Sequence, residues 1–267
     1  LAFSLDESAV SVLYLASRLM ELPLGVFTIS VATVFFPLLA KALSTGDDQA
    51  FSSSFLQGLR LVVGISLPAA VGLCVLGGPI IECLFHWGAF NQSDVTSTVP
   101  LLAIYGIGLP FYSIATFITR GLHASKDMIT PVRVAVYCLT INLLVGIILM
   151  QFIGAAGLAT ANVLAAIAQS YLLWRALSSR HEALNISAIF PELSKVILAG
   201  AVMGTICLLL STVVSMAGMG AKTGAILTVA IGVPSGASIY FALLYLLRFK
   251  DLDMIKSTLV RNLPSSR

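Results

Sequence analysis

The stretch that decides the fold is LASRLMELPLGVFTISVATVFFP, which runs from Leu15 to Pro37. It is apolar enough to enter a membrane, yet Arg18 and Glu21 lie near its start, and Pro23 interrupts it further on. An arginine at bilayer depth is costly and normally faces a protein interior or a water-filled cavity. Arg18 therefore marks a candidate functional site, and the rest of the chain should supply the apolar helices around it.

The composition places the chain in the membrane class. Of its 267 residues, 58% are hydrophobic and only 10% are charged, and the mean hydropathy is +1.00. A soluble domain carries about 25% charged residues. The net charge of +3, without a basic run interleaved with aromatics, gives no indication of a nucleic-acid partner. The four cysteines lie scattered in apolar stretches without a CxxC pair, so we expect neither a disulfide framework nor a metal site.

Seven stretches reach the length of about 20 mostly apolar residues that a spanning helix needs. They cover residues 12–43, 56–82, 97–120, 131–152, 156–177, 192–217 and 223–248. We therefore expect an all-α integral membrane protein with about seven transmembrane helices. The link at 154–157 is very short, which predicts an antiparallel hairpin of the fourth and fifth helices. Thr130 should cap the fourth helix, with Pro131 at its first position.

The charge distribution orients the chain in the membrane. The loops are numbered here from the end of the first predicted span. All but two of the 15 Lys and Arg residues fall in the odd-numbered loops, their flanking turns and the C-terminal tail. The exceptions are Lys222 and Arg18. Basic loops stay in the cytoplasm, so residues 251–267 are expected to be a cytoplasmic tail. Residues 1–11 are expected to be an outer-side loop at the end of a missing helix.

Three motifs together carry a resemblance to one family. They read Arg18-Leu19-x-x-x-Pro23-x-Gly25-Val26 followed by Pro37-x-Leu39, then Gly78-Pro79-Ile80-Ile81-x-x-Leu84-Phe85-x-x-Gly88-x-Phe90, then His123-Ala124-x-x-Asp127-x-x-Thr130-Pro131-Val132. In this order the chain resembles the bacterial lipid II flippases (MurJ, also MviN), within the multidrug, oligosaccharidyl-lipid and polysaccharide exporters. The resemblance implies a fourteen-helix fold of which this chain supplies the last seven helices. Residues 12–180 would form the five-helix part of the C-terminal lobe, and residues 181–250 the last two helices.

The resemblance also implies a function. Such a protein flips the lipid-linked peptidoglycan precursor across the cytoplasmic membrane of bacteria by alternating access. Its partners would be a lipid-linked diphosphate substrate, membrane lipids and the missing N-terminal half. No cofactor is expected, and the membrane potential or an ion gradient is a candidate driving force. Two alternatives stay open: another exporter of the same superfamily, or a non-transporting fragment. A membrane enzyme would need clustered Asp, His or Ser at a membrane face, and the spans offer none.

Arg18 matches the arginine that lines the central cavity in this family. A guanidinium binds phosphate oxygens through paired hydrogen bonds, so Arg18 is the predicted contact to a lipid diphosphate, with Glu21 as its orienting partner. The alternative is that Arg18 snorkels to the outer surface or only pairs with Glu21. The breaks at Pro23, Gly25 and Pro37 are predicted hinge positions.

Asn142 and Thr160 are a candidate ion site. Some members of the family hold sodium between the corresponding helices, with an acid four residues after the asparagine. Here that position is Gly146, and a hard cation prefers a carboxylate among its oxygens. Asn142 and Thr160 are then expected only to hydrogen-bond between helices.

Overall fold

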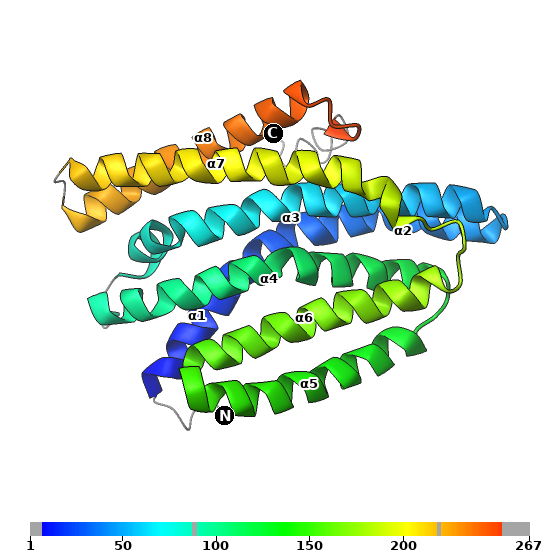
Figure 1. Ribbon diagram of the computed structural model, residues 1–267, viewed down its shortest axis with the longest axis horizontal. Coiled ribbons are helices and arrows are strands. Elements are labelled where there is room, and N and C mark those ends of the chain that lie inside the picture. Colours follow the sequence, from blue (N-terminus) through cyan, green and yellow to red (C-terminus); the bar gives the residue numbers. More distant parts are fainter. Residues whose placement is uncertain (1–6, 87–89, 218–219, 253–267) are drawn as a thin grey trace, which may run out of the picture.

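The computed structural model describes residues 7–86, 90–217 and 220–252, and over these ranges the regular elements are helices (Figure 1). The first span consists of α1 (Glu7–Pro23), a π-helical turn η2 (Leu24–Thr28) and α2 (Ile29–Ser44). The others are α3 (Asp48–Phe85), α4 (Gln92–Ala124), α5 (Ile129–Ile153), α6 (Ala155–Ser178), a 3-10 turn η3 (Ile186–Ile189), α7 (Phe190–Met216) and α8 (Ala221–Leu246). Within the described ranges, 7 spans are long and apolar enough to cross a membrane, which confirms the predicted number.

Two predicted boundaries are wrong. The outer loop expected over residues 1–11 is too long, because α1 already begins at Glu7, while residues 1–6 lie outside the described ranges. Thr130 does not cap α5, since it lies inside the helix. Asp127 does so instead: its Oδ1 accepts the backbone N–H groups of Ile129 and Thr130 at 3.1 and 3.0 Å. Gly88 of the second motif and the tail from residue 253 lie outside the described part of the chain.

The helices alternate in direction and lie roughly side by side (Figure 1). α3 packs along α4, α4 along α6, and α6 along α5, whereas the pair α7 and α8 packs on α3. α1 runs obliquely against α4, and α2 continues beside α3 (Figure 1). α5 contacts mainly α6, and the apolar window of its span is only 17% buried.

The predicted hairpin of α5 and α6 is present, and a glycine allows its two helices to pack closely. A Cβ built on Gly157 would overlap the backbone carbonyl of Leu149 in α5, so the two helices approach backbone to backbone there. Gly146 lies opposite Leu158 and Ala161 at ordinary contact distance. Small residues permit this approach where lipid provides no hydrophobic drive for helix association.

A side-chain hydrogen bond at a proline break joins α8 to α3. Pro68 in α3 has no N–H, so the carbonyl of Gly64, four residues earlier, loses its normal helical partner. The hydroxyl of Tyr240 in α8 donates to this carbonyl at 2.6 Å, and Tyr240 is buried. The proline break thus creates an acceptor that a residue 176 positions away satisfies.

Polar contacts tie the chain together where α2, α4 and α6 end and α3, α5 and α7 begin, which we call the basic end. The carboxylate of Asp251, after α8, accepts from Arg60 Nε at 2.7 Å and from Gln57 Nε2 at 3.0 Å, both in α3. Arg180 pairs with Asp127 at 2.7 Å, and His181 pairs with Asp48. Three loops and the segment after α8 are therefore held to one another at this end.

The pKa of Asp127 is lowered by this arrangement. Burial of the carboxyl acts in the opposite direction, but it is outweighed by hydrogen bonds from the Thr130 side chain and backbone, by the charge of Arg180 and by the backbone of Ile129. Asp127 therefore stays ionised as cap and ion-pair partner of the turn before α5.

Candidate substrate-binding site

One face of the first span is exposed along its length, and we call it the α1 stripe. The exposed positions recur every three or four residues, so they line up on one side of the helix. They are Ser11, Tyr14, Arg18, Glu21, Leu22, Gly25, Val26 and Ile29. The opposite face is buried against α4, through Ala16, Leu19 and Met20 among others. The stripe is polar as far as Glu21 and apolar from Leu22 onward.

Arg18 and Glu21 form the predicted pair on this stripe. Arg18 Nη1 donates to Glu21 Oε2 at 2.7 Å, and the two side chains are 57% and 47% exposed. The guanidinium carbon of Arg18 also lies 4.9 Å from the ring centre of Tyr14, within the range of a cation–π contact. Because a guanidinium has five N–H donors, the bond to Glu21 leaves others that can bind an anion.

A hollow of about 310 Å³ opens beside this pair, between α1 and the end of α3. Leu19, Leu22 and Phe85 complete its walls. The ion pair is exposed, so it holds Arg18 only weakly, and an incoming phosphate can replace Glu21 as its partner. The arrangement is suited to anion binding at a membrane-embedded position.

The three predicted hinge residues differ in their surroundings. Pro23 ends α1 and is followed directly by the π-helical turn η2, which contains Gly25. No atom outside the local helix lies within 4 Å of a Cβ built on Gly25. Pro37 lies inside α2, which continues through it without a break. The irregularity therefore falls at Pro23 and Gly25, and movement at these positions stays a prediction.

Asn142 and Thr160 lie on the hairpin helices α5 and α6. Thr160 donates its hydroxyl to the carbonyl of Ala156 in its own helix at 2.7 Å. Gly146, where an acid would complete a sodium site, packs against Leu158 and Ala161. These contacts are those of helix packing, and the ion site stays a prediction.

A polar pocket of about 320 Å³, which the sequence did not predict, lies between α4, α6 and η2. Its polar lining consists of Tyr112, Thr116, Thr119, Arg120, His123 and Gln169. The α4 members follow helical spacing, so a polar stripe within an apolar helix was the signal that could have found them. Gln169 could not be placed beside them, because the pairing of α4 with α6 is not readable from spacing. Leu24 also lines this pocket and lies next to Gly25 of the α1 stripe.

An apolar pocket of about 380 Å³, the α8 pocket, lies on the other side of the first span. α3, α7 and α8 supply most of its walls, Tyr240 included, and the first span contributes Pro23 and Phe27. Pro23 is five residues from Arg18, which is about 8 Å along a helix at 1.5 Å per residue. Five residues also turn a helix by about 140°, so Arg18 and Pro23 face different sides of α1.

Seven spans that are long and apolar enough to cross a membrane define a multi-pass membrane protein. Its family follows from comparison. A family model described as lipid II flippase MurJ matches residues 1–231, and the chain belongs to this family. The resemblance inferred from the three motifs is confirmed.

Curated relatives and a solved structure agree with this family membership. A probable lipid II flippase MurJ of Thermotoga maritima is 34% identical over 252 residues, covering 94% of this chain and 48% of the relative. One of Vibrio cholerae is 32% identical over 252 residues, covering 93% and 48%. A structure titled lipid II flippase MurJ, inward closed conformation, matches with a TM-score of 0.71 and 26% identity, covering 91% of this chain and 48% of that one. The chain spans about half the length of the curated relatives that it matches.

Proposed function

We propose that this chain acts as the C-terminal half of a flippase that moves lipid II across the bacterial cytoplasmic membrane by alternating access. The matched relatives carry this function in their names and are about twice as long. The observation that carries the proposal is the exposed guanidinium of Arg18 within a spanning helix, next to a hollow at the end of α3. The guanidinium suits the diphosphate, and the α8 pocket suits the polyprenyl tail.

The polar pocket extends this site toward the headgroup. Arg120, His123 and Gln169 offer hydrogen-bond donors to a sugar or peptide next to η2. The N-terminal half of the same protein would cover the α1 stripe and close the cavity. The charge bias supports a cytoplasmic basic end, and hence a cytoplasmic C-terminus.

The test is complementation of a bacterial strain depleted of its own flippase, using the full-length protein that contains this chain. We expect loss of rescue with Arg18→Ala and partial rescue with Arg18→Lys, which keeps the charge but not the paired donors. Arg133→Gln, an exposed basic residue of α5, is the matched control and should rescue fully. Full rescue by Arg18→Ala at equal membrane abundance would show that Arg18 does not bind the substrate.

Two further arms address the alternatives. The 267-residue chain expressed alone should not rescue, since half of the cavity is absent; rescue would contradict the half-site proposal. Purified full-length protein should bind lipid II in competition with undecaprenyl diphosphate. Binding of an undecaprenyl-linked polysaccharide in preference to lipid II would favour another exporter of the same superfamily.

A further inference from the structure

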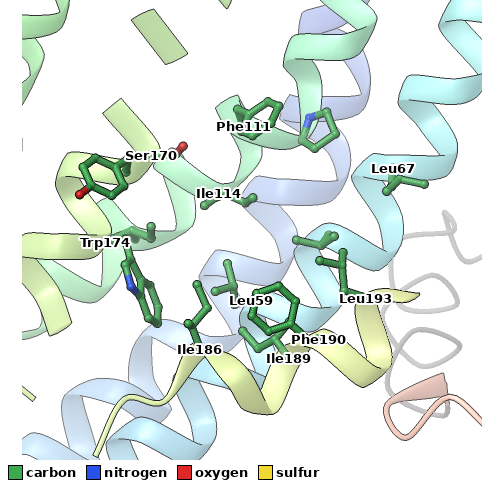
Figure 2. A pocket seen from close by; sticks show the side chains of 14 residues that line it. Leu59, Leu67, Phe111, Ile114, Ser170, Trp174, Ile186, Ile189, Phe190 and Leu193 are labelled. Carbon is green, nitrogen blue, oxygen red and sulfur yellow. The ribbon is translucent and has the colours of Figure 1, made fainter. Parts of the chain in front are cut away.

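An apolar groove of about 450 Å³, the α6 groove, lies between α3, α4, α6 and α7 (Figure 2). Leu59, Ile114, Trp174 and Leu193 point into it from these four helices, and η3 adds Ile189 (Figure 2). Its lining is almost entirely hydrocarbon. The hydroxyl of Ser170 donates to the carbonyl of Ile167 in its own helix at 2.8 Å, so it does not require a ligand. The walls are suited to an alkyl chain.

The groove begins at the level where the charged residues of the basic end stop. Arg60 follows the lining residue Leu59 in α3, and Arg175 follows Trp174 in α6. From there the groove continues inward to Leu67, which is seven residues beyond Arg60 and therefore about 10 Å deeper along α3. The hydrocarbon region of one leaflet is about 15 Å thick. The α6 groove thus covers most of the leaflet at the basic end.

The α6 groove is separate from the proposed substrate site. None of its lining residues belongs to α1, η2 or α2, whereas the α8 pocket contains Pro23 and Phe27 of the first span. α3 stands between the two, since it contributes Leu59 and Leu67 to the groove but Pro68 to the α8 pocket. A lipid in the groove would therefore be a different molecule from the flipped substrate.

The rim of the groove carries a positive charge. Arg175 is exposed and lies one turn beyond Tyr171, a lining residue, on the same side of α6. Trp174 partly lines the groove and places an indole N–H near the end of the helix, as aromatic residues do at membrane interfaces. Each basic residue at this level favours the binding of an anionic lipid headgroup by about 1 kcal/mol, which is about a fivefold gain in affinity.

We propose that the α6 groove binds one acyl chain of an anionic phospholipid from the leaflet at the basic end, with the phosphate at Arg175 and Trp174. Because lipid tails are as apolar as the groove, the tail gains little from the hydrophobic effect, and selectivity comes from the headgroup and from close packing. The proposal needs only the membrane location of the chain and stands independently of the substrate.

Trp174 supplies the probe. In the full-length protein with its other tryptophans replaced by phenylalanine, Trp174 fluorescence is followed in phosphatidylcholine vesicles with increasing brominated phosphatidylglycerol. We expect quenching that saturates at a lower mole fraction than with brominated phosphatidylcholine, and that inorganic phosphate does not reverse. Equal quenching by the two lipids would overturn the proposal, as would reversal by phosphate.

Matched variants locate the effect. Arg175→Gln should raise the half-saturating mole fraction about fivefold, while Arg133→Gln, at the same end of α5, should leave it unchanged. Ile114→Phe should fill the groove and remove the saturable phase, while Leu144→Phe on the exposed face of α5 should not. Arg175 is on the surface, so its variant tests the site even if Ile114→Phe fails to fold. An unchanged midpoint with Arg175→Gln would refute the headgroup assignment.

Discussion

The bond between Tyr240 and Gly64 should couple energetically to Pro68, which is not a partner in it. Removing the hydroxyl with Tyr240→Phe leaves the Gly64 carbonyl buried without a donor, because Pro68 cannot supply an N–H. If alanine replaces Pro68, its N–H can donate to that carbonyl in the ordinary helical pattern. The damage done by Tyr240→Phe should then be largely repaired.

The expected magnitudes follow from the burial of the pair. An unsatisfied buried acceptor costs about 1–3 kcal/mol, and side-chain hydrogen bonds in membrane proteins average about 0.6 and reach about 1.7 kcal/mol. Tyr240 is only 1% exposed, so we expect Tyr240→Phe to lower the free energy of unfolding by about 1.5 kcal/mol. In the Pro68→Ala background the same change should cost about 0.5 kcal/mol or less, which is a coupling of about 1 kcal/mol.

The assay is reversible unfolding in mixed micelles, with the four proteins of the double-mutant cycle measured together. Tyr137→Phe is the control, because Tyr137 is 65% exposed on α5 and should lose almost nothing. An equal cost of Tyr240→Phe in both backgrounds would refute the idea that Tyr240 replaces the donor missing at Pro68. The bond would then be an ordinary contact between α8 and α3.

Three other perturbations test the packing and the basic end. Gly157→Val must push α5 from α6 and should lower the free energy of unfolding by about 3 kcal/mol in the same assay; wild-type stability would contradict the close approach. Since the pKa of Asp127 is lower when folded, its stabilisation is complete above pH about 4 and is lost as the pH falls through the folded value. Asp127→Asn should reduce the fall in melting temperature over this acidic pH range. An unchanged slope would show that other groups cause the fall. Asp251→Asn leaves Arg60 without its carboxylate and should cost about 2 kcal/mol, with faster trypsin cleavage after Lys250; an unchanged cleavage rate would show that the ion pair does not hold this segment.

Hydropathy and charge predicted much of this fold because a bilayer restricts the backbone to helices of known length. The number of spans, the α5–α6 hairpin and the pairing of Arg18 with Glu21 could be read from the sequence, since each depends on local spacing. Asp127 and Thr130 are both good capping residues, and spacing alone does not show that Asp127 is the one that binds the first N–H groups of α5.

Contacts between segments that are distant in the sequence could not be predicted. Arg120 and Gln169 line one pocket only because α4 packs on α6, and Tyr240 reaches Gly64 only because α8 packs on α3. Apolar helices present similar faces in every direction, so their partners are set by shape and not by pattern. Pro23 predicted a break, but not that the break takes the form of a π turn.

That π turn sets the rotational phase of the first span. A π turn contains about one residue more than an α turn, and each residue of an α-helix advances by about 100°. Deleting Gly25 would convert the π turn into an ordinary α turn and keep Arg18 in phase with Phe35. Forming an α turn here with no residue removed would instead rotate everything before it by about 100° relative to Phe35 and the core behind α2. Arg18 would swing off its exposed face while the span kept its length and hydropathy. Loss of the π geometry without loss of a residue would thus leave insertion into the membrane intact and still misdirect the charge on which the proposed site depends.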